Sequence, residues 1–344
     1  MRRQQPASRP AVTIMKPLCG ADVMAELALE SFFLLDYPEY QLVFGVQDAN
    51  DPILEIVARL RARYPERDTV LMVNDTLHGS NRKISNLINM QPLAKHEIIV
   101  FSDADIHVAP YYLDALVAAL EEPKIGLVTT LYTALPGAQM LAARLGAAQI
   151  NQVFLPSALL ARKLGRQDCM GATMAITKSV LEKSGGLKAL VNHLADDQVL
   201  GRRVINAGYK VELAHDIPAA TVPEADFSSL FRHELRWART IRALVPVAYT
   251  GSILQIPLLW AVLCVLVSGF TAWSLVLLFC AVVARVVFAW RVEHILRLPR
   301  TGEIWLLLVR DLFSLIIYIA SFTGSRVDWR GQSMVADSGR PSSG

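Results

Sequence analysis

The chain has few cysteines, little net charge and no internal repeat, and each shortage narrows the kinds of protein it can be. Its 344 residues include four cysteines without paired spacing, at positions 19, 169, 264 and 280. This pattern indicates a reducing compartment and argues against a structural zinc site. A net charge of +3 provides no strong electrostatic footprint for nucleic acid, so we expect no nucleic-acid partner. We expect the polar segment 337–344 to be disordered.

Apolar sequence is in excess, and it is concentrated in the last third of the chain. Hydrophobic residues make up 53% of the total, and the mean hydropathy is +0.35, too high for an ordinary soluble domain. Segments 249–290 and 304–323 are almost continuously apolar. They are long enough for about three membrane helices of about 20 residues each. The first would end near Ser268 and Gly269, which suit a tight turn.

Arginines flank these predicted spans. Four precede the first span and three lie between the second and third: Arg232, Arg236, Arg239, Arg242, Arg291, Arg297 and Arg300. The positive-inside rule places both regions in the cytoplasm, together with the large amino-terminal domain. We therefore expect a multi-pass protein of the cytoplasmic (inner) membrane. The polar start shows no signal peptide, so insertion would depend on the carboxyl-terminal helices.

Strand-like and helix-like segments alternate up to about residue 240. Runs rich in β-forming residues at 12–15, 42–46, 70–73 and 98–101 are separated by amphipathic segments, clearest at 22–35 and 53–64. This alternation predicts an α/β fold with a parallel sheet and helices on both faces. The predicted organisation is a polar tail (1–10), a cytosolic domain (11–226), an interfacial amphipathic helix (227–247), about three transmembrane helices (248–324) and a second polar tail (325–344).

Acidic residues follow two of the predicted strands. Asp103 and Asp105 come after the strand at 98–101, and Asp48 comes after the strand at 42–46. Open α/β sheets bind ligands beyond the carboxyl ends of such strands. Two carboxylates suit a divalent ion that bridges a nucleotide's phosphates, and Asp48 would serve the base or ribose of the same ligand. An isolated Asp-x-Asp is more often an ordinary acidic turn, and Asp51-Pro52 is explained as a helix start.

Two later clusters also have a structural and a chemical interpretation. Asp196 and Asp197 open an amphipathic segment, where they would favour the helix dipole, or a carboxylate there would act as a general base toward an acceptor hydroxyl. The segment around Arg236 and Trp237 is a basic amphipathic helix for the headgroup layer, with Trp237 as its interfacial anchor. Arg236 could at the same time bind a leaving diphosphate.

Ionisable residues also fall inside the predicted spans, at Arg285, Arg310 and Asp311. Such residues are costly in lipid and are usually paired or face a polar cavity. Snorkelling or a structural pair is the favoured explanation, and an acceptor headgroup pocket is the alternative.

Taken in order, several segments resemble the ceramide glucosyltransferase family. The segments are Lys16-Pro17-Leu18-Cys19-Gly20, Phe33-Leu34-Leu35-Asp36-Tyr37-Pro38, Gln47-Asp48 with Asp51-Pro52, Lys83-Ile84-Ser85-Asn86-Leu87, Asp103-Ala104-Asp105, Gly171-Ala172-Thr173-Met174, Asp196-Asp197 and Arg236-Trp237. The match covers roughly residues 11 to 245. The chain resembles the bacterial hopanoid-linked glycosyltransferases of this family about as well.

The resemblance implies a GT-A, Rossmann-like fold, inverting chemistry, a UDP-sugar donor and Mg²⁺ or Mn²⁺. By position, it makes Asp48 the nucleotide-binding aspartate and Asp197 the catalytic base. It assigns Asp103 and Asp105 to the metal-and-phosphate motif, and Lys16 and Lys83 to donor binding. Arg236-Trp237 resembles the end of the family's (Gln/Arg)-x-x-Arg-Trp motif.

The chain departs from the family pattern in two places. His233 stands where that motif usually has Gln or Arg, which leaves its role open. The amino-terminal membrane helix usual in the family is also missing, so either the start is placed too late or the other spans suffice.

The expected function is sugar transfer from a UDP-sugar to a hydroxyl of a membrane lipid, a hopanoid or a ceramide, at the bilayer surface. The sequence does not choose between glucose, N-acetylglucosamine and galactose. A processive polysaccharide synthase and a catalytically silent membrane scaffold are the alternatives. About three spans argue against a polymer channel, and the acidic set argues against a scaffold.

Overall fold

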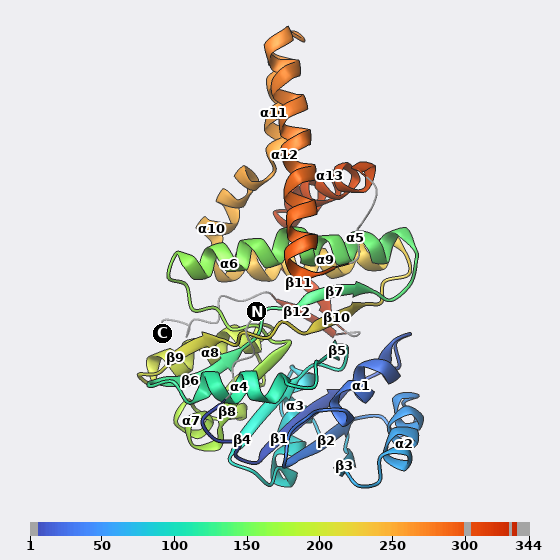
Figure 1. The fold of residues 1–344 in the computed structure, drawn as a ribbon, viewed down its shortest axis with the longest axis vertical. Coiled ribbons are helices and arrows are strands. Elements are labelled where there is room, and N and C mark those ends of the chain that lie inside the picture. The colour runs from blue at the N-terminus through green and yellow to red at the C-terminus, as the bar shows by residue number, and fades with distance from the viewer. Residues whose placement is uncertain (1–5, 299–303, 330–331, 336–344) are drawn as a thin grey trace. The chain divides into compact units, whose positions relative to one another are not determined.

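The computed structural model describes residues 6–298, 304–329 and 332–335, and the chain divides into two compact units (Figure 1). The first unit comprises residues 1–137 and 157–223, and the second comprises residues 138–156 and 224–344. The tail predicted at 337–344 lies outside the described residues.

A seven-stranded mixed sheet forms the centre of the first unit. In spatial order its strands are β3 (Asp68–Val73), β2 (Tyr40–Val46), β1 (Val12–Leu18), β4 (Ile98–Ser102), β8 (Thr173–Thr177), β6 (Ile125–Thr129) and β9 (Lys210–Leu213). The four predicted strands are confirmed as β1 to β4, which pair in parallel. Strand β8 is antiparallel to both β4 and β6. This direction was not predictable from the local pattern, because the pairing of a strand depends on distant partners.

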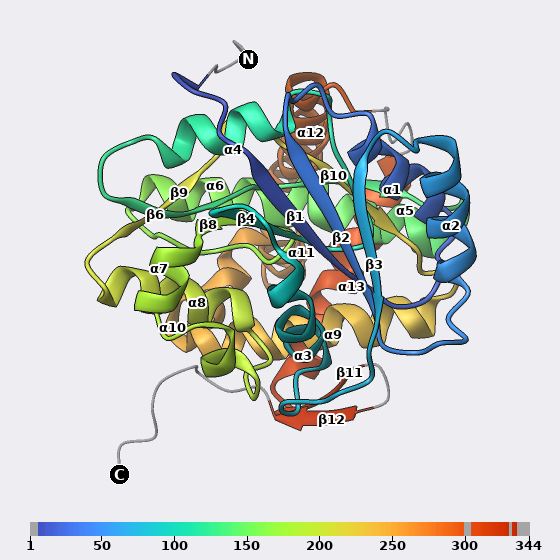
Figure 2. The ribbon, with the colours of Figure 1, turned by 90° about the horizontal axis from the view of Figure 1, so that it is seen from below.

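Helices cover both faces of this sheet (Figure 2). One face carries α1 (Ala25–Phe33), α2 (Ile53–Arg63) and α4 (Tyr112–Leu120), and the other carries α3 (Arg82–Met90), α7 (Lys178–Lys183) and α8 (Asp196–Asn206). A hydrophobic core lies between the sheet and the helices on each face. Along β2 the side chains alternate between the two cores: Leu42 and Phe44 pack on the face of α1, α2 and α4, and Val43 packs on the other face. The predicted α/β architecture with two covered faces is confirmed.

The smaller elements of this unit connect the main ones. They are the short sheet β5 (Ile106–His107), β10 (Ala219–Val222) and β7 (Thr133–Pro136), the 3₁₀ turns η1 (Gln91–Leu93) and η3 (Leu187–Leu190), and α6 (Leu155–Lys163), which contains the boundary between the units.

A glycine on β2 allows α3 to pack unusually close to the sheet. A Cβ at Gly45 would lie 2.4 Å from Asn86 Oδ1 and from Met90 Sδ. Instead, Asn86 Nδ2 donates a hydrogen bond of 2.8 Å to the Gly45 carbonyl oxygen. This contact fixes α3 and therefore the position of Lys83 in its first turn.

The second unit is mainly helical. Its elements are α5 (Leu141–Gln149), the π-helix η2 (Ile150–Phe154), α9 (Phe227–Leu244), α10 (Pro246–Gly251), the 3₁₀ turn η4 (Ser252–Gln255), α11 (Pro257–Val267), α12 (Ala272–Leu296), α13 (Ile304–Ser321) and the hairpin β11 (Arg326–Trp329) and β12 (Gln332–Val335). Helices α11 and α12 form a hairpin whose far end projects from the unit (Figure 1), while Arg285 and Glu293 of α12 contact Asp311 of α13 and Gln152 of η2. The turn between them has Gly269 at φ +69° and Phe270 at φ +61°, which confirms the tight turn predicted there.

Length and hydropathy identify candidate spans among the described residues, and the prediction of about three spans stays a prediction. Among the described residues, α12 is long and apolar enough to cross a membrane, and the bent pair formed by residues 246–255 and 257–267 would raise the number to two. Several large apolar side chains of α12, including Trp273, Val276 and Phe279, are exposed, as expected of a lipid-facing helix.

The third predicted span is α13, whose ionisable residues are paired inside the unit. Asp311 accepts hydrogen bonds from Arg285 of α12 at 3.0 Å, and Arg310 pairs with Glu234 of α9 at 2.7 Å. The structural-pair explanation of Arg285, Arg310 and Asp311 is therefore confirmed.

Candidate active site

A buried lysine lies against the acidic motif at the carboxyl ends of β1 and β4. Lys16 is fully buried, and its Nζ donates to the Asp103 carbonyl oxygen at 2.7 Å and to Ser102 Oγ at 3.3 Å. The same atom lies 3.6 Å from the centre of the Phe32 ring on α1. Burial lowers the pKa of Lys16 to about 7, although Asp105 and Asp103 oppose this shift. An anion arriving at this edge would therefore favour the charged form.

A second lysine approaches the same motif from α3. Lys83 Nζ lies 2.5 Å from Asp103 Oδ1 and donates to the Gly171 carbonyl oxygen at 3.4 Å. Burial alone would lower the pKa of Lys83, but the carboxylates around it, chiefly that of Asp103, raise it above its ordinary value. Lys83 is therefore a cation at neutral pH.

Asp105 is a buried acidic residue of the same motif. Burial raises the pKa of Asp105 to about 6, with a further contribution from Asp103. A divalent cation would relieve this penalty. Across the described ranges, no three or more His, Cys, Asp or Glu side chains are grouped so as to hold a metal. A metal here would therefore take Asp103 and Asp105 as protein ligands and complete its shell with phosphate or water oxygens.

Asp197 is held at the start of α8 by two backbone amides. Its Oδ2 accepts from Gly171 N at 2.8 Å and its Oδ1 accepts from Gln198 N at 2.7 Å. A Cβ at position 171 would lie 3.2 Å from Asp197 Oδ2, so glycine permits this close approach. Burial, and then the neighbouring Asp196, raise the pKa of Asp197 to about 7. A fixed carboxyl group that titrates near neutrality has the properties of a general base.

Asn81 is a site residue that the sequence analysis missed. It is fully buried and caps α3 by accepting from Ile84 N at 3.0 Å. Its Nδ2 donates to the His193 carbonyl oxygen at 2.8 Å and to Asp196 Oδ1 at 3.4 Å. Asn81 thus ties the start of α3 to the start of α8. The available signal was an Asn before an apolar run of helical period, which is typical of an N-cap.

Asp48 lies at the end of β2, the parallel neighbour of β1, and so shares its sheet edge with Lys16. It is exposed, and its Oδ1 accepts from Asn50 N at 2.8 Å. Asp51 accepts from Ile53 N at 2.9 Å and from Gly20 N at 2.8 Å. The predicted helix start is confirmed to within one residue, since α2 begins at Ile53 with Pro52, not Asp51, at its N-cap position. Asp51 also anchors the loop after β1.

Arg236 and Trp237 lie on α9 in the second unit, where they are half-buried. His233 Nδ1 of the same helix pairs with Glu224 Oε1, and the His233 ring meets the Trp237 ring edge-on at 4.5 Å. Burial favours a higher pKa for Glu224, but His233 and Arg236 lower it below its ordinary value. The second unit thus contains a polar and aromatic cluster of Glu224, His233, Arg236 and Trp237.

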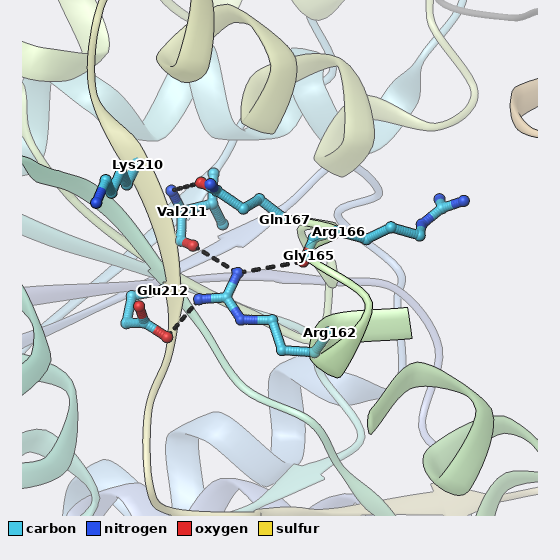
Figure 3. Close-up of a pocket in the computed structure, with 7 residues that line it drawn as sticks. All are labelled: Arg162, Gly165, Arg166, Gln167, Lys210, Val211 and Glu212. Atoms are coloured by element: carbon cyan, nitrogen blue, oxygen red, sulfur yellow. Dashed lines mark hydrogen bonds and ion pairs between the residues drawn. The ribbon is translucent and has the colours of Figure 1, made fainter. Parts of the chain in front are cut away.

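A hollow of about 190 Å³ in the first unit is lined by none of the predicted site residues. Figure 3 shows the Arg162 guanidinium between β9 and the loop after α6. It donates to the Val211 carbonyl oxygen at 2.9 Å and pairs with Glu212. Gln167 Oε1 accepts from Val211 N at 3.0 Å. These contacts attach the segment after α6 to the edge strand β9, so we assign the hollow a structural role.

The sequence matches known proteins along most of its length. The model of glycosyl transferase family 21 matches residues 1–341. Ceramide glucosyltransferase 3 of Caenorhabditis elegans is 26% identical over 250 residues, which are 71% of this chain and 53% of that protein. Ceramide glucosyltransferase 1 of the same organism is 24% identical over 243 residues, which are 69% of this chain and 51% of that protein. The chain spans about half the length of these curated relatives.

A solved structure has a similar fold. The mannosyltransferase of Pyrobaculum calidifontis, in complex with GDP-Man and Mn²⁺, matches 93% of this chain and 88% of its own chain. The TM-score is 0.54 and the identity is 18%. At this identity the likeness concerns the fold alone, and it confirms the expected GT-A-like α/β class.

Proposed function

Because this chain belongs to glycosyl transferase family 21, we propose that it is a membrane-bound inverting glycosyltransferase, which moves a sugar from a UDP-sugar to a hydroxyl of a membrane lipid. The Caenorhabditis elegans relatives are named ceramide glucosyltransferases, which supports a lipid acceptor. A ceramide or a hopanoid is the acceptor class we propose.

One observation carries the proposal. Polar contacts run without a break from the end of β1 to the start of α8, through Lys16, Asp103, Lys83, Gly171 and Asp197. The lysines and Asp103 have the chemistry to hold a pyrophosphate and its counter-ion, and Asp197 has the chemistry of a base. A transfer between a nucleotide-sugar and a hydroxyl needs both functions in one site.

In the proposed reaction, the acceptor oxygen attacks C1 of the sugar from the face opposite UDP. Asp197 takes the hydroxyl proton while the bond between C1 and the UDP oxygen breaks and a new bond from C1 to oxygen forms. One carboxylate suffices because no covalent glycosyl intermediate is required, as in inverting hydrolysis with water replaced by the lipid hydroxyl. A pKa of about 7 for Asp197 lets the same group accept the proton and release it afterwards.

Asp103 and Asp105 would hold Mg²⁺ or Mn²⁺. The raised pKa of Asp105 and the Mn²⁺ named with the Pyrobaculum calidifontis structure support this assignment. A bound divalent ion would neutralise charge on the departing UDP. Lys16 and Lys83 add positive charge beside the same oxygens, and Asp48 would bind the base or ribose.

The second unit would contribute the remaining charge and the membrane contact. Arg236 would stabilise the leaving diphosphate, while Trp237 would anchor α9 at headgroup depth. The exposed apolar surface of α12 supports insertion in a bilayer. The distribution of arginines around the apolar segments supports a cytoplasmic location for the first unit, at the inner membrane.

The test is transfer itself. Membranes containing the full-length protein are incubated in turn with labelled UDP-glucose, UDP-N-acetylglucosamine and UDP-galactose, with ceramide or hopanoid supplied. The extracted lipids are then analysed by mass spectrometry. We expect a glycolipid that depends on one of these donors and is absent with Asp197→Asn. Label in polymer, or no labelled lipid with any donor, would contradict the proposal.

A further inference from the structure

Arg310, a buried arginine of α13, forms an ion pair with α9, the helix that carries Arg236. Arg310 is fully buried, and its Nη1 and Nη2 donate to Glu234 Oε1 and Oε2 at 2.7 and 2.8 Å. Nη1 also donates to the Leu145 carbonyl oxygen on α5 at 3.2 Å, and Nε donates to Ser314 Oγ at 3.2 Å. The guanidinium is thus fixed on three sides within the second unit.

A paired fork of this kind fixes orientation as well as distance. Two parallel hydrogen bonds between a guanidinium and a carboxylate resist rotation of either group in a way that one bond to a lysine cannot. Aromatic contacts strengthen the same seam, because the Phe313 ring on α13 lies 6.3 Å from that of Phe227 and 6.2 Å from that of Phe231 on α9. The rotation of α9 about its own axis is therefore set by α13.

The helix geometry converts this rotation into displacement of Arg236. At about 100° per residue, Glu234 and Arg236 lie about 200° apart around α9, so Arg236 is on the side away from α13. Side chains reach about 6 Å from a helix axis. A roll of about 10° would then shift the Arg236 end by about 1 Å, which is enough to cost about 100-fold in rate when the group acts on reacting atoms.

We propose that Arg310 is a positioning residue for the transfer: acting through Glu234, it fixes the rotation of α9 within the second unit and with it the direction in which α9 presents Arg236. The inference rests on the proposed function, because it deepens the role given there to Arg236.

The neighbouring ion pair supplies a matched control. Asp311 follows Arg310 on α13 and is nearly as buried, but it accepts from Arg285 of α12 at 3.0 and 3.2 Å. Arg285 Nη1 then donates to Gln152 Oε1 of η2 at 3.3 Å. Asp311→Asn therefore disturbs a buried ion pair of the same helix, α13. The described contacts of this pair are with α12 and η2.

The experiment compares Arg310→Lys with Asp311→Asn in the full-length protein in nanodiscs. Turnover is measured with a short-chain acceptor and normalised to folded protein. Arg310→Lys keeps the charge and removes the fork, so we expect kcat to fall about 10–100-fold while the donor KM stays within about threefold. We expect Asp311→Asn to change kcat less than about threefold. In an Arg236→Ala background, Arg310→Lys should cause less than about a twofold further loss, because both act on one step.

Three results would overturn the positioning role: wild-type kcat in Arg310→Lys, equal losses in both variants, or independent losses in the double variant. If Arg310→Lys does not fold, Glu234→Asp tests the same fork from α9 by shortening its carboxylate arm.

Hydrogen exchange of the α9 amides gives a readout independent of activity. It should quicken around Arg236 in Arg310→Lys but not in Asp311→Asn. Unchanged exchange refutes the positioning role even if no donor supports transfer, whereas absent transfer by the wild type counts against the proposed function.

Discussion

Replacing Asp197 by Asn should abolish most of the proposed transfer while leaving donor binding nearly intact. The amide cannot accept the acceptor's proton, and general-base catalysis is worth about 10²–10⁴ in rate. We therefore expect kcat to fall by about that factor. The donor dissociation constant should stay within a few fold, because Lys16 and Lys83, the basic groups proposed to bind the pyrophosphate, are untouched.

The hydrogen bonds of Asp197 set the structural cost of this substitution. Its two oxygens accept from Gly171 N and Gln198 N, whereas Asn has one acceptor oxygen and a donor amide. One backbone N–H would lose its partner, which costs about 1–3 kcal/mol. For a domain of this size the midpoint of thermal unfolding should fall by roughly 2–12 °C. Turnover must therefore be expressed per folded protein.

The raised pKa of Asp197 adds a dependence on pH. The base works only when it is deprotonated, so wild-type kcat should rise about tenfold per pH unit below pH 7 and level off above it. Asp196→Asn removes a charge that raises the pKa of Asp197, so this rise should move toward lower pH. Asp196→Asn therefore serves as the matched control: we expect it to retain activity, with its pH–rate profile shifted toward lower pH.

Initial rates with labelled UDP-sugar between pH 5 and pH 9, together with equilibrium binding of UDP, provide the assay. Turnover of Asp197→Asn within about tenfold of wild type, or a pH rise that survives in that variant, would refute Asp197 as the base. Asp196 would then be the first candidate to examine.

Three further outcomes follow from the site. Activity should require Mg²⁺ or Mn²⁺, and Asp105→Ala should weaken both metal dependence and donor affinity; full activity in excess EDTA would contradict this. Arg236→Ala should lower kcat even with a short-chain acceptor, whereas Trp237→Ala should mainly impair long-chain acceptor use; identical losses on both acceptors would show that the two residues act as one unit. Lys83→Met removes the contact of 2.5 Å with Asp103 and should raise the donor KM by about tenfold or more, with an unchanged KM as the contrary result.

Most residues of the candidate site could be predicted from the sequence because they stand next to the ends of predicted strands and helices. Asp48, Asp103 and Asp105 stand directly after apolar runs, and parallel strands bring their carboxyl ends to one edge whatever the remaining topology. Asp197 was found as one of two acids at a helix start. The sequence does not reveal that Gly171 and Gln198 clamp Asp197, or that Asn81 joins the two helix starts, because these contacts link residues with no regular spacing.

Hydropathy and tertiary contacts describe different properties of the carboxyl-terminal helices. Segment 304–323 predicts a third span because apolar residues dominate it, and within that pattern Arg310 and Asp311 register only as an energetic cost. Their partners, Glu234 and Arg285, lie 76 and 26 residues away. Hydropathy is a property of one segment, whereas the pairing of buried charges depends on which helices become neighbours.

The sequence by itself determined the α/β class, four strands, the acidic sheet edge and the apolar segments, because strand and helix periods and hydropathy act over a few residues. The tertiary structure decided the antiparallel insertion of β8, the environment that raises the pKa of Asp197 to about 7, and the fork between Arg310 and Glu234. Each of these depends on burial and on contacts between distant parts of the chain. Such contacts exist only after the hydrophobic cores on the two sheet faces and in the helical unit have formed.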